Sequence, residues 1–179
     1  MAEDIRIAII GHGFMGHEHE KMLNDFPGIK LVGIADKDPK QLEDVKEGIK
    51  RYTDNQELFD DPEVDVVIIA ANNNQHHDLV LQAAAAKKDI ICEKPVAMSL
   101  EELDDMEKAV RKNGVKFTVH QQRRFDPDFR TAKKSMIPAH WEKYMPSKIS
   151  CTDLTVICMT GMFLSVKVVV CSMTGECIF

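Results

Sequence analysis

Three closely spaced glycines are the residues whose chemistry is clearest in the sequence. Gly11, Gly13 and Gly16 form a G-x-G-x-x-G pattern directly after the apolar run IRIAII. A glycine turn that opens a helix leaves backbone N–H groups free to bind a pyrophosphate, and the helix dipole adds positive potential. Asp36 ends the next apolar run, about 20 residues later, where a carboxylate accepts a hydrogen bond from a ribose hydroxyl. The pattern predicts a dinucleotide site.

The identity of the dinucleotide depends on the residues at positions 36 and 37. A carboxylate repels a 2′-phosphate, so Asp36 favours NAD, whereas Lys37 beside it leaves NADP open. The segment ANNNQHH, residues 71–77, follows a third apolar run, and such loops line the ligand crevice of parallel sheets. Its asparagines could equally cap the following helix. The predicted cofactor site also includes the residues that lie between the glycines, His12, Phe14 and Met15. It further includes the first two residues of the loop, Ala71 and Asn72.

The segment CEKPVA, residues 92–97, places an acid, a lysine and a proline after another apolar run. A lysine at the end of a strand could polarise a substrate hydroxyl and ease its deprotonation. Judged by residue type alone, Lys94 is more often a solvated surface lysine. Both interpretations are open on chemistry alone.

The histidines and cysteines do not predict a metal site. His12, His17 and His19 surround the glycines, and we expect them to be exposed. His17 and His19 face different ways on a helix and make a poor metal pair. Cys92 is the only cysteine before residue 135, so no disulfide framework is predicted there. The other four cysteines lack zinc-finger spacing: Cys151, Cys158, Cys171 and Cys177.

Alternating strands and helices would position these motifs. The predicted strands are residues 5–10, 29–36, 64–71, 89–92 and 115–120, and the predicted helices are residues 14–24, a charged stretch within 38–52, 75–88 and 100–113. Such alternation implies an α/β fold with a doubly wound parallel sheet. The 179 residues carry a net charge of −6, which argues against a nucleic-acid surface. The acidic first residues do not resemble a signal peptide, so a cytoplasmic protein is expected.

Four motifs in order, GHGFMG, GIADKDP, EKPVA and RRFDPDF, make residues 4–134 similar to the Gfo/Idh/MocA family of oxidoreductases. The resemblance implies an N-terminal NAD(P)-binding Rossmann domain and a larger α/β domain that covers the active site and mediates oligomerisation. It also implies oxidation or reduction of a sugar, polyol or inositol. We expect the second domain to be essentially missing here, so that homo-oligomers, typical of full-length members, are doubtful for this chain.

The resemblance also implies roles for individual residues. Lys94 would be the catalytic lysine near the nicotinamide, within the E-K-P motif. The family's P-N-x-x-H segment is matched except that Asn72 replaces the proline. The remaining matches, which add cofactor contacts and lead towards the second domain, are Asn73, His76, Glu93, Arg123 and Arg124.

Residues 135–179 have a different character from the preceding domain. One hypothesis is a reading-frame change near Lys134, because shifted codons permit the string HDSGALGKVYAF from Ser135 onwards and a D-x-x-x-H pattern across residues 173–178. The family uses that histidine for acid–base catalysis, and the sequence as written contains no such pattern. Alternatively, residues 154–179 are a genuine tail, formed of strands or of a membrane segment that Lys167 disfavours.

The expected function is NAD(P)-dependent oxidation or reduction of a sugar, polyol or inositol-like substrate. We expect this chain to bind nucleotide with little turnover, since it lacks the acid–base histidine. The alternative is a non-catalytic dinucleotide-binding sensor or pseudoenzyme. A membrane-tethered protein is a third class.

Overall fold

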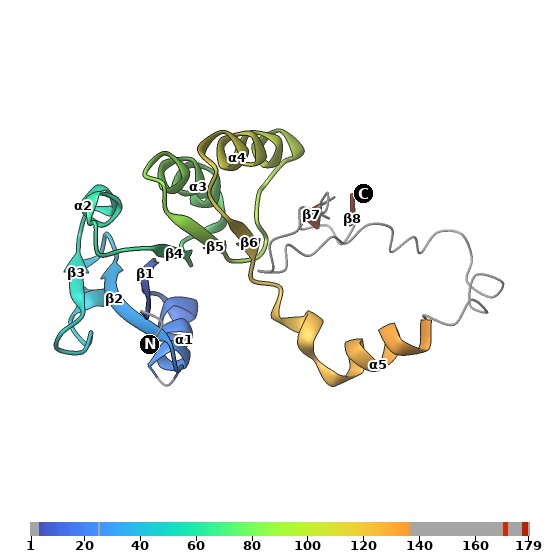
Figure 1. The fold of residues 1–179 in the computed structure, drawn as a ribbon, viewed down its shortest axis with the longest axis horizontal. Helices are drawn as coiled ribbons and strands as arrows, with labels where there is room; N and C mark the ends of the chain where they lie inside the picture. The colour runs from blue at the N-terminus through green and yellow to red at the C-terminus, as the bar shows by residue number, and fades with distance from the viewer. Residues whose placement is uncertain (1–3, 25, 137–169, 172–176, 179) are drawn as a thin grey trace.

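The computed structural model describes residues 4–24, 26–136, 170–171 and 177–178. Six strands form one parallel sheet in the order β3-β2-β1-β4-β5-β6, which confirms the doubly wound prediction (Figure 1). The order reverses between β1 and β4, and ligands bind beside such a switch point in this fold. The strands are β1 (Ile5–Ile10), β2 (Ile29–Ala35), β3 (Lys50–Tyr52), β4 (Val66–Ile69), β5 (Asp89–Cys92) and β6 (Phe117–Val119).

Helices lie on both faces of the sheet, with α3 and α4 on one face and α1 on the other (Figure 1). The α-helices are α1 (Phe14–Leu23), α2 (Asn55–Asp60), α3 (His76–Ala85), α4 (Leu100–Asn113) and α5 (Pro127–Met136). Short 3-10 turns are η1 (Pro39–Leu42), η2 (Asn73–Gln75) and η3 (Gln122–Phe125). Both faces of the central strands are therefore covered.

The continuous apolar strand runs follow from this double cover. Ile7 and Ile9 of β1 pack in a cluster with Leu42 of η1, while Ala8 and Ile10 pack in a second cluster with Leu79 of α3. Successive side chains of a strand point to opposite faces, so both sets must be apolar. The core thus holds the carboxyl ends of β1, β2 and β4 in fixed register.

The charged helix predicted within residues 38–52 is wrong. Only η1 is helical there, with Asp38 accepting from the backbone N–H of Lys40, and the chain then turns through Gly48 at φ +91 into β3. Pairing of β3 with β2 outweighs the helix propensity of the charged residues between them. Residues 55–60, where no helix or strand is predicted, form α2, which Asp54 caps through the N–H of Gln56.

The predicted boundary between residues 134 and 135 falls inside α5, which runs from Pro127 to Met136. Most of the segment that the reading-frame and tail hypotheses concern lies outside the described residues. Beyond the end of α5, its described part is one antiparallel pair, β7 (Val170–Cys171) with β8 (Cys177–Ile178). Within the described ranges, no helix has the length and apolarity needed to cross a membrane.

Candidate functional site

A cleft of about 320 Å³ opens at the carboxyl ends of β1, β2 and β4, and we call it the glycine-loop cleft. Six of the predicted cofactor residues line it: Gly11, Gly13, Asp36, Lys37, Ala71 and Asn72. Three further polar residues on its walls are not predicted from the sequence, Asp38, Gln41 and Asn55, and a fourth, Gln75, lies in the segment 71–77 that is expected to line the crevice. Two of these follow Asp36 closely, and Asn55 follows the cap of α2, so a search of the turns after each strand would have found them.

The three glycines differ in what surrounds them. At Gly11, whose φ is +91, an added Cβ would lie 2.7 Å from the backbone nitrogen of Ala71. At Gly16 it would lie 2.1 Å from the carbonyl oxygen of Gly11, so α1 packs directly on the loop. At Gly13 it would meet no atom within 4 Å. Only Gly13 therefore faces open space, as close approach of a ligand to the backbone requires.

The first turn of α1 presents free backbone donors to this space. Gly13 is its N-cap and supplies no capping side chain, and no acid stands in the first turn. By contrast, Asp54 caps α2, and Ser99 caps α4 through the N–H of Glu102. Uncapped N–H groups and the helix dipole favour an anion. The cleft therefore has an anion-binding end at α1.

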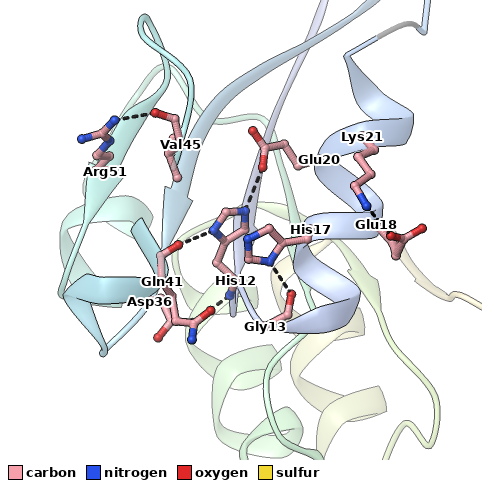
Figure 2. Close-up of polar contacts among 10 residues, drawn as sticks. All are labelled: His12, Gly13, His17, Glu18, Glu20, Lys21, Asp36, Gln41, Val45 and Arg51. Atoms are coloured by element: carbon pink, nitrogen blue, oxygen red, sulfur yellow. Dashed lines mark hydrogen bonds and ion pairs between the residues drawn. The ribbon is translucent and has the colours of Figure 1, made fainter. Parts of the chain in front are cut away.

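Asp36 provides the opposite rim of the cleft. Its Oδ2 accepts from the backbone N–H of His12 at 2.7 Å, and its Oδ1 accepts from the N–H of Asp38 at 2.9 Å. These two bonds hold the carboxylate in one orientation, and Figure 2 shows the bond from His12. Further lone pairs remain on both oxygens for a ligand hydroxyl.

The other predicted cofactor residues do not line the glycine-loop cleft. Gly16 is buried beneath it, Met15 is half-buried and Phe14 is 81% exposed. Asn73 begins η2 at one side. Arg123 is exposed, and its guanidinium contacts Asp126 at 3.1 Å. Of the predicted cofactor residues, these five therefore lie around the glycine-loop cleft and not in its lining.

Lys94 stands at the carboxyl end of β5, exposed, on a turn that is held from two sides. The ring of buried His76 lies 2.9 Å from the carbonyl oxygen of Pro95 and 3.0 Å from that of Ala71. It thereby links the loops after β4 and β5. The N–H of Glu93 donates to the carbonyl of Ile69 at 2.9 Å. These contacts fix the backbone that carries Lys94 while leaving its ammonium group accessible.

Glu93 is buried behind Lys94 and joins three elements. Its Oε1 lies 2.9 Å from Nε2 of His19 on α1 and 2.7 Å from Nδ1 of His120 after β6, and its Oε2 accepts from the N–H of Lys94. Burial by itself would raise the pKa of Glu93, but the hydrogen bonds from the two imidazoles outweigh it and lower the pKa to about 2. Glu93 is therefore ionised throughout the neutral range.

His19, Glu93 and His120 are also metal-ligand types, with donor atoms within 4.8 Å of one another. One oxygen of Glu93 already accepts from both rings, so the three side chains satisfy one another without an ion. In the sequence, His19 lies near only His17 and His12, so residue spacing does not bring these three side chains together.

The expected exposure of the three N-terminal histidines is wrong. His12 and His19 are 0% and 3% exposed, and His17 is half-buried, stacked on His12 at a ring distance of 3.9 Å. Their hydrogen-bond partners lie on other elements, or at least one helical turn away along the chain. The local sequence shows none of these partners, so it predicts that the side chains are exposed to solvent.

Comparison with known proteins agrees with this arrangement. The family model described as an oxidoreductase family with an NAD-binding Rossmann fold, Gfo/Idh/MocA, matches residues 5–121. The chain is 36% identical to the scyllo-inositol 2-dehydrogenase (NAD⁺) of Bacillus subtilis over 138 residues, which are 75% of this chain and 40% of that protein.

Solved structures give the same result. The myo-inositol 2-dehydrogenase of Lactobacillus plantarum is 32% identical with a TM-score of 0.70, over 75% of this chain and 41% of that one. An oxidoreductase of Agrobacterium radiobacter, solved with NAD⁺, L-tartaric acid and magnesium, is 33% identical with a TM-score of 0.70, over 74% and 40%.

The chain therefore spans about 40% of the length of the relatives it matches. The matched portion contains the parallel sheet, the glycine loop and the E-K-P turn. By this match, the chain belongs to the Gfo/Idh/MocA family of oxidoreductases, through its NAD-binding Rossmann fold.

Proposed function

We propose that the glycine-loop cleft binds NAD, with the pyrophosphate at the start of α1 and the adenosine ribose at Asp36. The observation that carries the proposal is the pairing of open space at Gly13 and uncapped α1 donors with a fixed carboxylate across one cleft. A dinucleotide needs these two groups at these two places. The donors bind phosphate oxygens, and the carboxylate binds ribose hydroxyls.

Asp36 also supports a preference for NAD over NADP. Both of its oxygens are tied to backbone N–H groups, so the carboxylate cannot easily turn away from a 2′-phosphate. Exposed Lys37 follows Asp36 directly and is the one positively charged residue in the motif GIADKDP. We propose that NAD is the main ligand and that NADP binds more weakly.

We propose that the reaction of this type of oxidoreductase is transfer of a hydride. The hydride moves between NAD and a carbinol or carbonyl carbon of a polyol, sugar or inositol. Two relatives named above are inositol dehydrogenases. Bound nicotinamide would accept or donate the hydride. Lys94, accessible on a rigid turn at the carboxyl edge, would bind the reacting oxygen and assist its proton transfer.

We propose that this 179-residue chain binds nucleotide with little turnover. Its sequence contains no Asp four residues before a His, the pattern that supplies the acid–base partner. Orientation of the substrate and proton transfer both need groups beyond Lys94. A dinucleotide-binding sensor would share the cleft and differ only in lacking catalysis.

Calorimetric titration of NAD tests the binding site. We expect saturable binding to the purified chain and about tenfold weaker binding to Asp36→Ala, since a charge-assisted hydrogen bond contributes roughly 1.5 kcal/mol or more. Asp44→Ala is the matched control, because Asp44 is exposed and does not line the cleft. Equal affinity of Asp36→Ala and wild type would contradict the placement of the ribose.

Turnover is tested separately by following NADH absorbance over a panel of inositols and other polyols. We expect no rate above background for the wild-type chain. A rate that disappears in Lys94→Ala would contradict the proposed lack of turnover while supporting the role of that lysine. The same variant should keep NAD affinity within about threefold, because Lys94 is outside the cleft lining.

A further inference from the structure

The two sides of the glycine-loop cleft differ in the polar groups that they leave free for a ligand. On the side of β2 and β3, Asp36 keeps lone pairs on both oxygens, and the first N–H groups of α1 have no capping side chain. The lining of that side continues with Lys37, Asp38, Gln41 and Asn55. It contains the groups assigned above to the pyrophosphate and the adenosine ribose.

Asn55 extends this side of the cleft beyond the ribose. It follows β3, and the N–H of Asp36 donates to the carbonyl oxygen of Tyr52, the last residue of β3, at 3.1 Å. In Figure 1, β3 and α2 lie on the far side of β2 from β4 and β5. Asn55 is half-buried, and its side-chain amide has no hydrogen-bond partner among the described residues. Such an amide offers donors and an acceptor, the two kinds of group that the edge of adenine binds.

The other half of a dinucleotide extends from the pyrophosphate over the ends of β4 and β5, because the crevice crosses the point where the strand order reverses. The lining of the cleft follows this direction only as far as Ala71, Asn72 and Gln75, after β4. No described residue of β5, β6 or the loops that follow them belongs to the lining. The cleft therefore encloses the adenosine diphosphate end of the ligand and not the nicotinamide end.

The buried polar side chains at the ends of β4 and β5 already have partners within the protein. Both ring nitrogens of His76 contact backbone carbonyls. The carboxylate of Glu93 accepts from two imidazoles and from the N–H of Lys94, and the N–H of Glu93 donates to the carbonyl of Ile69. A carboxamide placed here would exchange these hydrogen bonds for others of similar strength, so it would gain little binding free energy.

Lys94 presents an exposed charge at the same edge. The nicotinamide ring is positively charged in NAD⁺ and neutral in NADH, so a nearby ammonium group acts differently on the two forms. Water and salt screen an exposed ammonium group, and its effect on affinity is about threefold or less. The redox state of the ring therefore has little influence on binding.

We infer that the ligand class of the glycine-loop cleft is the adenosine diphosphate nucleotides as a whole. ADP-ribose binds as tightly as NAD⁺, and the cleft does not distinguish NAD⁺ from NADH. This inference rests on the proposed binding of NAD and names the part of the molecule that is recognised. The chain then responds to the total amount of such nucleotides and not to the ratio of oxidised to reduced cofactor.

The test is calorimetric titration of the full chain with NAD⁺, NADH, ADP-ribose, AMP and nicotinamide mononucleotide. We expect the dissociation constants of the first three to agree within about threefold, the range that an exposed charge allows. AMP should bind at least about tenfold more weakly, because it lacks the second phosphate and its charge-assisted hydrogen bonds to α1. Nicotinamide mononucleotide should not compete with NAD⁺ at millimolar concentrations.

Two variants examine the adenosine end directly. Asp36→Ala and Asn55→Ala should each weaken NAD⁺, NADH and ADP-ribose by the same factor, since all three ligands share the adenosine diphosphate end. Asn74→Ala is the matched control, because Asn74 is an exposed amide of η2 outside the cleft lining. A variant that weakens NAD⁺ and leaves ADP-ribose unchanged would overturn the inference, because the lost contact would belong to the nicotinamide half.

The outcomes for the two proposals differ. If none of the nucleotides binds, the proposed function fails, and the inference fails with it. If NAD⁺ binds but its dissociation constant differs from that of ADP-ribose or NADH by more than about threefold, NAD binding stands and the inference is refuted. Competition by nicotinamide mononucleotide would refute the inference in the same way.

Discussion

Gly13→Ala is expected to leave the melting temperature of the NAD-free protein within about 2 °C of wild type and to weaken NAD binding more than tenfold. The new methyl group meets no protein atom within 4 Å, and the backbone φ of −75 is one that alanine adopts readily. It would instead occupy the space above the first N–H groups of α1. A phosphate oxygen must come within about 3 Å of those groups to accept a hydrogen bond.

Gly16→Ala provides the contrast, because its methyl group has no room inside the protein. The methyl carbon would lie 2.1 Å from the carbonyl oxygen of Gly11, a backbone atom that moves only if α1 moves. Overpacking of this kind costs about 1–3 kcal/mol, or roughly 5–10 °C in melting temperature for a domain of this size. Binding of NAD should weaken as well, since α1 carries the donors.

Differential scanning calorimetry and NAD titration of both variants distinguish the fold from the ligand. Unchanged NAD affinity in a folded Gly13→Ala protein would show that no ligand approaches this backbone. Loss of stability in Gly13→Ala equal to that in Gly16→Ala would show that the two glycines serve packing alike. Gly28→Ala is an unsuitable control because its φ is +79.

The glycine motif could be interpreted from the sequence because its requirements are local. The apolar run of β1, the three glycine spacings and the acid after β2 lie within 32 residues, from Ile5 to Asp36. Strand β5 and helix α4 were predicted with the bounds that the structure shows, since DIIC is a short apolar run and Ser99 and Gly114 cap the two ends of α4. Local caps and periodicity suffice for such elements.

The buried polar contacts could not be predicted in this way. His19 and Glu93 are 74 residues apart, and only the parallel pairing of the strands brings α1 beside the end of β5. A histidine on a charged helix is expected to be exposed to solvent. Its buried partner here, Glu93, can be identified only once the order of the strands in the sheet is known. The same applies to η1, where the pairing of β3 with β2 replaced the predicted charged helix.

Glu93 is expected to make the stability of the protein depend on pH in the acid range. Burial would raise its pKa, but the bonds from His19 and His120 prevail and lower the pKa from 4.5 to about 2. The folded protein thus binds this proton more weakly than the unfolded chain does. Its contribution is complete above about pH 4.5 and is lost as the pH falls towards 2. The lowered pKa corresponds to roughly 3 kcal/mol.

Glu93→Gln removes the charge and keeps the size of the side chain. The variant should be less stable than wild type by roughly 3 kcal/mol at pH 7, and the difference should shrink as the pH falls from about 4.5 towards 2. Urea unfolding followed by circular dichroism, at pH values from 2.5 to 7, measures both quantities. Glu107→Gln is the control, since Glu107 lies on exposed α4 surface and pairs with Arg111 across one turn.

The contribution of Asp61 to the stability of the protein is lost in the same acid range. The quantity to compare is therefore the difference in stability between Glu93→Gln and wild type at each pH. Hydrogen bonds from Lys50 and then Tyr52 lower the pKa of Asp61 to about 2, and both proteins retain them. Their effect cancels in the difference, because Asp61 and Glu93 share no partner. Parallel stability curves for wild type and Glu93→Gln would mean that the imidazoles do not hold Glu93 in its charged form.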